Sequence, residues 1–302
     1  MAQCPRMELV RDIIAAKKAA GRPVISFEFF PPKTEEGDRT LLEKTIPTLL
    51  ELKPDFCSVT YGAGGGTRDK TLMIVDRIQR EHHFATVMHM TCVNATIEQV
   101  AEVVAQARAA GVKNILALRG DPPGSAGVFR KTEGGFEYSF QLVAFLKQLG
   151  GLSIGTAGFP EGHIACKEGK YVDWEHLKHK IDCGADFVIT QLFFDNADFF
   201  EFRDHLVNKL GVKVPIFPGI LPIQGANQVR RITALCGAKI PAPMLATLEK
   251  LGDDDAAATQ YGIDYATNQC AELLRAGVPG LHLYTLNKSQ PTIQVLRNLK
   301  LA

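Results

Sequence analysis

Glu28 is the residue whose neighbours in the sequence point most directly to chemistry. It lies among aromatic residues, in the segment Phe27–Phe30. Burial of a carboxyl group withdraws solvent from its charged form, so the protonated form is favoured. A protonated carboxyl group can act as a general acid. Because buried ion pairs also shift pKa values, the alternative is a structural glutamate paired with Arg119 or Lys33.

Asp121 is a second candidate for chemistry. It follows an Arg-Gly step and precedes Pro122-Pro123-Gly124, a sequence that predicts a rigid turn. Such a turn can hold a carboxylate at a site, because loops carry many functional residues. The alternative is an aspartate that only forms the turn. Its position directly after a predicted strand favours the functional interpretation.

A predicted helix carries a third group of polar residues. Asp173, His176 and Lys180 are spaced i, i+3 and i+7, which places them on one helix face. Asp173 is predicted to be the N-cap. The positive end of the helix dipole and this face could hold a ribose and a pyrophosphate. A solvated face is the alternative, and His179 lies beside the stripe.

Other polar motifs carry less weight. The segment Gly62–Thr67 lacks the Gly-Lys-Ser/Thr ending of a phosphate loop, so we expect a flexible loop at the mouth of the domain. His176 and His179 are spaced for a metal ion but lack Cys or carboxylate company in a ligand pattern. His82-His83 is typical of a helix end, and Asp253–Asp255 of an acidic helix start. We therefore expect no metal site.

Eight short runs rich in β-branched and aromatic residues must position these groups. The first seven are each followed by a stretch of helical character, and several are nearly continuous apolar runs, as in a buried parallel sheet. The predicted strands are Val24–Phe30, Phe56–Tyr61, Ala85–Cys92, Asn114–Arg119, Leu152–Ala157, Phe187–Phe193, Val214–Ile220 and Gly280–Leu286.

This alternation predicts one α/β domain over residues 1–302, a (β/α)8 TIM barrel rather than an open doubly wound sheet. An amphipathic helix containing Val10 precedes the barrel, and Thr96 with Gln99 predicts a capping box. Between the seventh and eighth strands we expect two helices, Gln228–Cys236 and Asp255–Ala276. Barrel enzymes carry their catalytic groups at the C-terminal strand ends, where Glu28 and Asp121 would lie.

Composition restricts the partners. The 302 residues have a net charge of +1, which gives no electrostatic reason to bind nucleic acid or an anionic membrane. No segment approaches the roughly 20 apolar residues of a bilayer span. The seven cysteines are scattered without a CxxC pair, and the N-terminus lacks a signal-peptide core. We expect a cytoplasmic protein with reduced thiols and a small-molecule substrate.

Motifs at successive strand ends resemble those of the methylenetetrahydrofolate reductase family, over about Ile25 to Leu296. Their order along the chain carries the resemblance more than any one of them does. The matching segments are Phe27–Lys33, Val59–Ala63, His89 with Thr91-Cys92, Leu118–Pro123, Ile189–Asp195, Pro218–Pro222 and Tyr284–Asn287.

The resemblance implies a tightly bound FAD across the barrel mouth, with NADH or NADPH as hydride donor and methylenetetrahydrofolate or methyltetrahydrofolate as the folate. It implies a binding role for the helix face described above. The residues implied around FAD are Thr60, His89, Leu118, Arg119, Gly120, Asp121, Tyr138, Ser139, Ala157, Phe159, His163, Asp173, His176, His179 and Lys180.

For the folate, the resemblance points to Glu28, Asp121, Gln191, Gln228, Tyr284 and Lys288. The sequence departs from the family pattern at four places. Lys288 stands where relatives often have Arg, and Lys lacks the planar fork of Arg. His176 and His179 replace Asn and Arg, and Ile232 replaces an aromatic residue. These departures affect contacts to the folate tail and the FAD phosphates, and leave the carboxylates untouched.

The mechanism implied is ping-pong, since no separate nucleotide domain is visible and both substrates would meet the same flavin face. Glu28 would protonate N10 of the folate, and Asp121 would offset the positive charge that follows. We expect a homo-oligomer. Because the chain ends at Ala302, we expect no regulatory domain. The alternatives are a flavin-free folate-binding methyltransferase barrel and a non-catalytic flavin-binding paralogue.

Overall fold

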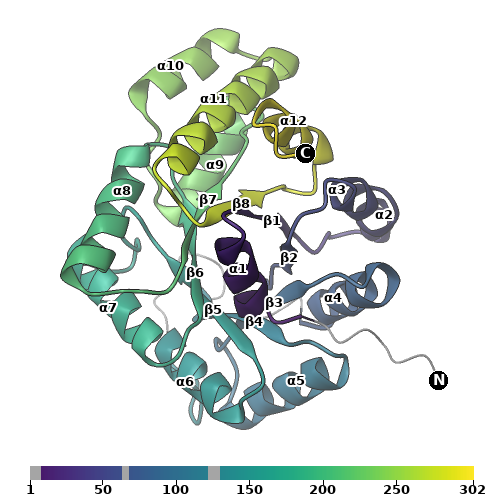
Figure 1. The fold of residues 1–302 in the computed structure, drawn as a ribbon, viewed down its shortest axis with the longest axis vertical. Coiled ribbons are helices and arrows are strands. Elements are labelled where there is room, and N and C mark those ends of the chain that lie inside the picture. Colours follow the sequence, from purple (N-terminus) through teal and green to yellow (C-terminus); the bar gives the residue numbers. More distant parts are fainter. Residues whose placement is uncertain (1–7, 63–67, 122–129) are drawn as a thin grey trace.

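The protein is a closed barrel of eight parallel strands (Figure 1). The computed structural model describes residues 8–62, 68–121 and 130–302. All eight predicted strands are confirmed, with ends within two residues of the predicted ones. The strands are β1 (Val24–Phe29), β2 (Phe56–Val59), β3 (Thr86–Thr91), β4 (Asn114–Leu118), β5 (Ser153–Gly158), β6 (Phe187–Leu192), β7 (Ile216–Ile220) and β8 (Gly280–Tyr284).

Helices surround the barrel (Figure 1). The capping box predicted at Thr96 and Gln99 is confirmed at the start of α5. Two short π-helical turns, η1 (Leu41–Thr45) and η2 (His205–Lys209), continue α2 and α8. The α-helices are α1 (Val10–Ala19), α2 (Glu35–Thr40), α3 (Ile46–Leu50), α4 (Arg68–His82), α5 (Ile97–Ala109), α6 (Ser139–Leu149), α7 (Lys170–Asp182), α8 (Asn196–Asp204), α9 (Ala226–Cys236), α10 (Ala242–Leu251), α11 (Asp255–Arg275) and α12 (Ser289–Asn298).

Two helix predictions are wrong. Both helices predicted between β7 and β8 are confirmed, as α9 and α11, but their number is wrong because a third, α10, lies between them. The additional helix α10 has Pro241 at its N-cap and Pro243 in its first turn, where proline is tolerated although it interrupts a helical sequence pattern. Helix α7 begins at Lys170 with Gly169 as its N-cap, so Asp173 lies in the first turn and is not the cap.

Alternation along β1 separates two cores. Phe27 and Phe29 belong to the large apolar cluster between the strands and the helices. Val24 belongs to a second cluster inside the barrel, which Val10 and Ile14 of α1 join. Helix α1 therefore closes one end of the barrel with apolar side chains (Figure 1). Successive side chains in a strand point to opposite faces, so Glu28 faces the interior.

The remaining expectations on composition concern cysteines and membranes. The six cysteines in the described part of the chain are all free thiols, as predicted, while Cys4 lies outside it. Among the described residues, no helix combines the length and the apolar character needed to span a membrane. The loops predicted at residues 63–67 and 122–124 lie outside the described residues.

Candidate active site

The carboxylate of Glu28 lies inside the barrel among polar groups from three neighbouring strands. Ser58 Oγ on β2 donates to Glu28 Oε2 at 3.2 Å. His282 Nε2 on β8 is 3.2 Å from the same oxygen, and His89 Nε2 on β3 is 3.3 Å from it. Glu28 is only 5% exposed. One carboxylate oxygen therefore carries all of these contacts, while Oε1 has no hydrogen-bond partner among the described residues.

This environment corrects the prediction that burial keeps Glu28 protonated. Burial does raise the pKa of the carboxyl group, but the charge of His89 and the hydrogen bond from His282 outweigh it and lower the pKa to about 2. The aromatic neighbours Phe27 and Phe29 do not surround the carboxylate, because they face the helices. In the described residues the contacts of Glu28 are Ser58, His282 and His89, and not Arg119 or Lys33 as in the alternative of a structural ion pair.

Hydrogen bonds join the loop after β8 to the loop after β1, next to Glu28. Asn287 Nδ2 donates to the carbonyl of Phe30 at 2.7 Å, and its Oδ1 accepts from the Phe30 amide at 3.0 Å. Leu286 and Asn287 have φ angles of 46° and 59°, a conformation that costs a non-glycine residue free energy. Thr285 Oγ1 donates to the Glu28 carbonyl at 2.7 Å. These contacts hold the mouth of the barrel in one shape.

A second cluster lies where β5 meets α7. Lys180 Nζ donates to the carbonyl of Ala157 at 2.8 Å, and Asp173 Oδ2 accepts from the His163 amide at 3.1 Å. The Phe159 carbonyl accepts from the indole of Trp174. The structure therefore brings together four residues that the sequence placed around a cofactor: Ala157, Phe159, His163 and Asp173, with Lys180 beside them.

Positive charge is concentrated at this cluster. Burial lowers the pKa of Lys180 to about 8; Asp173 opposes this shift and Arg119 adds to it. The pKa of His163 is lowered mainly by burial, and Arg119 and Lys180 lower it further. An anion bound between Arg119 and Lys180 would relieve their repulsion. These residues therefore fit a pyrophosphate. Asp121, whose charge raises the pKa of His163, is itself exposed.

Aromatic side chains extend this cluster along α6 and α7. Tyr138 stacks on Phe140 with ring centroids 5.8 Å apart, and Phe140 meets His179 edge-on at 4.6 Å. Tyr138 is 47% exposed, so it presents a free ring face to a ligand. The neighbouring Ser139 begins α6. Phe140 is a residue that the sequence analysis missed.

The other predicted ligand-binding residues lie at strand ends and in the adjoining loops. Tyr284 Oη donates to the Thr190 carbonyl across the barrel at 2.7 Å. Gln228 Oε1 accepts from the Gln224 amide at 2.8 Å, which fixes the loop before α9. Gln191 lines a crevice beside Phe159. The rest are Thr60 after β2, Leu118 at the end of β4, Gly120 with φ 87°, and the exposed Lys288 before α12.

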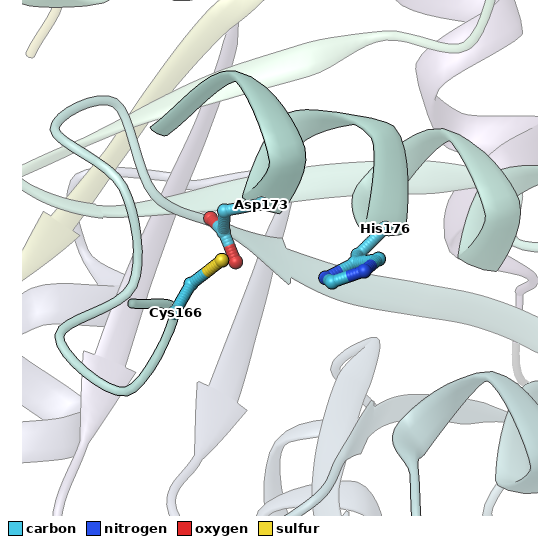
Figure 2. Close-up of side chains that lie close together, drawn as sticks. All are labelled: Cys166, Asp173 and His176. Carbon is cyan, nitrogen blue, oxygen red and sulfur yellow. The ribbon is translucent and has the colours of Figure 1, made fainter. Parts of the chain in front are cut away.

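His176 does have a cysteine and a carboxylate beside it, the ligand types that the sequence pattern lacked. The ligand atoms of Cys166, Asp173 and His176 lie within 4.8 Å of one another, with Asp173 and His176 on α7 and Cys166 on the preceding loop (Figure 2). These are donors that zinc accepts. Cys166 was missed because its turn, rather than a helical spacing, brings it back to α7.

Sequence reasoning also missed the inner partners of Glu28. Ser26, Ser58 and His282 are all fully buried. The signal available in the sequence was alternation: Ser26 is two residues before Glu28, and His282 is two residues before Tyr284. Residues with this spacing share a strand face. The register between β1 and β8, with Ser26 opposite His282, was needed to bring them together.

A closed parallel barrel with ionisable groups at its C-terminal strand ends defines the class of TIM-barrel enzymes. The pattern that characterises the family "Methylenetetrahydrofolate reductase" matches residues 11–300. The chain belongs to this family.

Two relatives illustrate the match. The "5,10-methylenetetrahydrofolate reductase" of Escherichia coli (strain K12) is 37% identical over 92% of this chain and 91% of its own length. "Methylenetetrahydrofolate reductase (NADH) 1" of Arabidopsis thaliana is 41% identical over 97% of this chain. The chain spans about half the length of that plant relative, 51%.

A solved structure shares the fold. It is described as an uncharacterized protein from Clostridium thermocellum that binds two copies of 5-methyl-5,6,7,8-tetrahydrofolic acid. Its TM-score is 0.64 at 15% identity, over 95% of this chain and 99% of the other. At this identity the likeness concerns the barrel fold alone.

Proposed function

We propose that this protein catalyses the FAD-dependent reduction of 5,10-methylenetetrahydrofolate to 5-methyltetrahydrofolate by NADH or NADPH, or the reverse oxidation. Membership of the family and the names of its relatives support methylenetetrahydrofolate reduction. The observation that carries the proposal is the position of Glu28. Its carboxylate lies at the C-terminal end of β1, with Oε2 bound by the protein and Oε1 left for a ligand.

In this cluster, Arg119, Asp173 and Lys180 would hold the pyrophosphate and ribose of FAD, and His163 and Tyr138 would lie beside these three residues. The repulsion between Arg119 and Lys180 supports this assignment, because a bound dianion would remove it. When bound, FAD would supply hydride transfer between the nicotinamide nucleotide and the one-carbon unit of the folate. We expect the nucleotide to leave before the folate enters, which gives ping-pong kinetics.

In the folate half-reaction, Glu28 would give a proton to N10 of the bridged substrate. The bond between N10 and the bridging carbon then breaks, its electron pair goes to N10, and an iminium group forms at N5. Asp121 would offset the positive charge of this iminium. Tyr284 and Gln191, at the ends of β8 and β6, would hold the folate against the mouth. A positioned acid contributes about 10²–10⁴ in rate.

The wider setting follows from the proposed reaction. A product carrying a methyl group on N5 suits one-carbon metabolism and methionine biosynthesis. The free thiols are consistent with a cytoplasmic location, and we propose a homo-oligomer. The choice between NADH and NADPH is tested by comparing their rates of flavin reduction.

Absorbance spectroscopy tests the proposal. We expect the purified protein to be yellow and to release stoichiometric FAD on denaturation. NADH or NADPH should bleach the flavin band, and methylenetetrahydrofolate should restore it. Colourless protein that does not take up FAD would favour the methyltransferase alternative. Bound FAD that neither substrate reduces or oxidises would favour the non-catalytic paralogue.

A further inference from the structure

The polar network inside the barrel continues beyond Glu28. His282 Nδ1 is 2.8 Å from Ser26 Oγ, and Ser26 Oγ donates to the Leu281 carbonyl at 3.3 Å. His282 Nε2 faces Glu28 Oε2 at 3.2 Å. The side chains of Ser26 and His282 are both fully buried. The network therefore joins the candidate acid to a group that the proposed function does not yet use.

Counting protons along this network leaves two possible forms of His282. In one form, the hydroxyl proton of Ser26 points to the Leu281 carbonyl and its oxygen accepts from His282 Nδ1–H; in the other, Ser26 donates to Nδ1 and Nε2–H donates to Glu28. A neutral imidazole carries one N–H. In the first form His282 Nε2 is an acceptor facing an oxygen of Glu28, and the contact is favourable only if Glu28 carries a proton between the two atoms.

We propose that Ser26 and His282 are positioning residues that keep one proton on the contact between His282 and Glu28, and so supply Glu28 with the proton it delivers to the folate. This inference rests on the proposed function. Rotation of the carboxyl group carries the proton from His282 to the mouth. There the O–H bond of Glu28 breaks and the N10–H bond of the folate forms, which leaves a carboxylate facing the acceptor Nε2, an arrangement that favours the uptake of a new proton.

The proposal resolves a conflict between burial and function. With both imidazoles acting as donors, Glu28 has a pKa of about 2 and is an anion in the neutral range, which is unsuitable for an acid. His282 acting as an acceptor reverses its effect on the carboxyl group. Two other titratable groups face the contact: His89 on β3, at 3.3 Å, and Tyr284, whose ring is 5.5 Å from that of His282.

The other groups around this contact are the same in every variant. Burial raises the pKa of Tyr284 well above its ordinary value, and Glu28 raises it further, so Tyr284 stays neutral. On β2, Ser58 and Phe56 are uncharged, and Phe56 stacks on the His282 ring at 6.5 Å. His89 is present in every variant below. A change in pH dependence on altering Ser26 therefore reports on the contact of Glu28 with His282.

Nitrogen-15 spectra of histidine-labelled protein test the inference without any substrate. In the wild type we expect His282 to carry its proton on Nδ1. Ser26→Ala removes the acceptor of that proton, so His282 should change to the form with the proton on Nε2. Cys57→Ser is a control, since Cys57 is also buried but lies on the opposite face of β2, in the cluster that faces the helices, and contacts Thr86. A wild-type His282 with a bare Nδ1 would overturn the proposal.

Single-turnover kinetics give the second readout. Ser26→Ala should slow the folate half-reaction about tenfold or more at neutral pH, with recovery as the pH is lowered and protons reach Glu28 from solvent. Reduction of the flavin by the nucleotide should be unchanged. A uniform loss at all pH values would mean a structural role and would refute the proposal. Wild-type protein without folate turnover would refute the proposed function instead, while the spectra still decide the state of His282.

Discussion

The ammonium group of Lys180 donates to the carbonyl of Ala157 at 2.8 Å, which joins the last turn of α7 to β5. A lysine in this position keeps one fixed orientation and has two donors left for a ligand. Burial and the nearby Arg119 lower its pKa to about 8, against the opposing effect of Asp173. Its charge is therefore lost at a pH where the protein can be studied.

The first prediction concerns FAD affinity. Lys180→Ala should weaken FAD binding roughly 10- to 100-fold, the value of a charge-assisted hydrogen bond, while chemistry in FAD-saturated protein changes less. In the wild type, affinity should fall as the pH rises through about 8, because neutral lysine no longer attracts phosphate. The variant should lose this dependence. Fluorescence titration with FAD measures both effects.

Lys178 provides the control for this titration. It lies on the same helix but pairs with Asp182, away from Asp173. Lys178→Ala should leave FAD affinity and its pH dependence unchanged. Equal affinities for wild type and Lys180→Ala would mean that the α7 face is only a solvated surface.

The second prediction separates the two half-reactions through Glu28→Gln. Glutamine keeps the shape of the side chain but cannot deliver a proton. The folate half-reaction should fall by at least about 10², and flavin reduction by the nucleotide should change far less. Stopped-flow measurements on one preparation give both rates, and Glu102→Gln, on the exposed face of α5, is the control. Equal slowing would indicate a structural role, and no slowing would require another acid.

The third prediction concerns Gly219 in β7. A Cβ atom there would lie 2.3 Å from the Thr190 carbonyl and 2.7 Å from the Tyr284 ring. Gly219→Ala should therefore destabilise the protein by about 1–3 kcal/mol, as overpacking does, and displace Tyr284. At Gly225 the nearest atom is 3.9 Å away, so Gly225→Ala should cost much less. Urea unfolding compares them; equal midpoints would show that the barrel interior adapts.

The fourth prediction concerns the loop after β8. Asn287→Gly removes both contacts to Phe30 but suits the positive φ of this position. Asn287→Ala removes the same contacts and keeps the backbone cost, so it should be less stable than the glycine variant by about 1 kcal/mol. Both should raise the KM for folate, because the loop carries Lys288. Identical KM values in all three proteins would mean that this loop does not meet the substrate.

The sequence by itself determined the barrel and which residues lie at its mouth. Alternating strands and helices predict parallel strands, and the C-terminal ends of parallel strands meet at one end of a barrel. Glu28, His89 and Tyr284 were therefore placed together without coordinates. Helical periodicity put Asp173 and Lys180 on one face of α7, and the family resemblance gave that face its predicted binding role.

Only the tertiary structure decided what surrounds those residues. Glu28 and His282 are 254 positions apart, and barrel closure between β1 and β8 brings them into contact. The sequence neighbours Phe27 and Phe29 suggested a raised pKa, but they face the helices. A pKa depends on charges and donors within a few ångströms in space. Strand pairing across the whole chain sets those distances, and local sequence does not encode them.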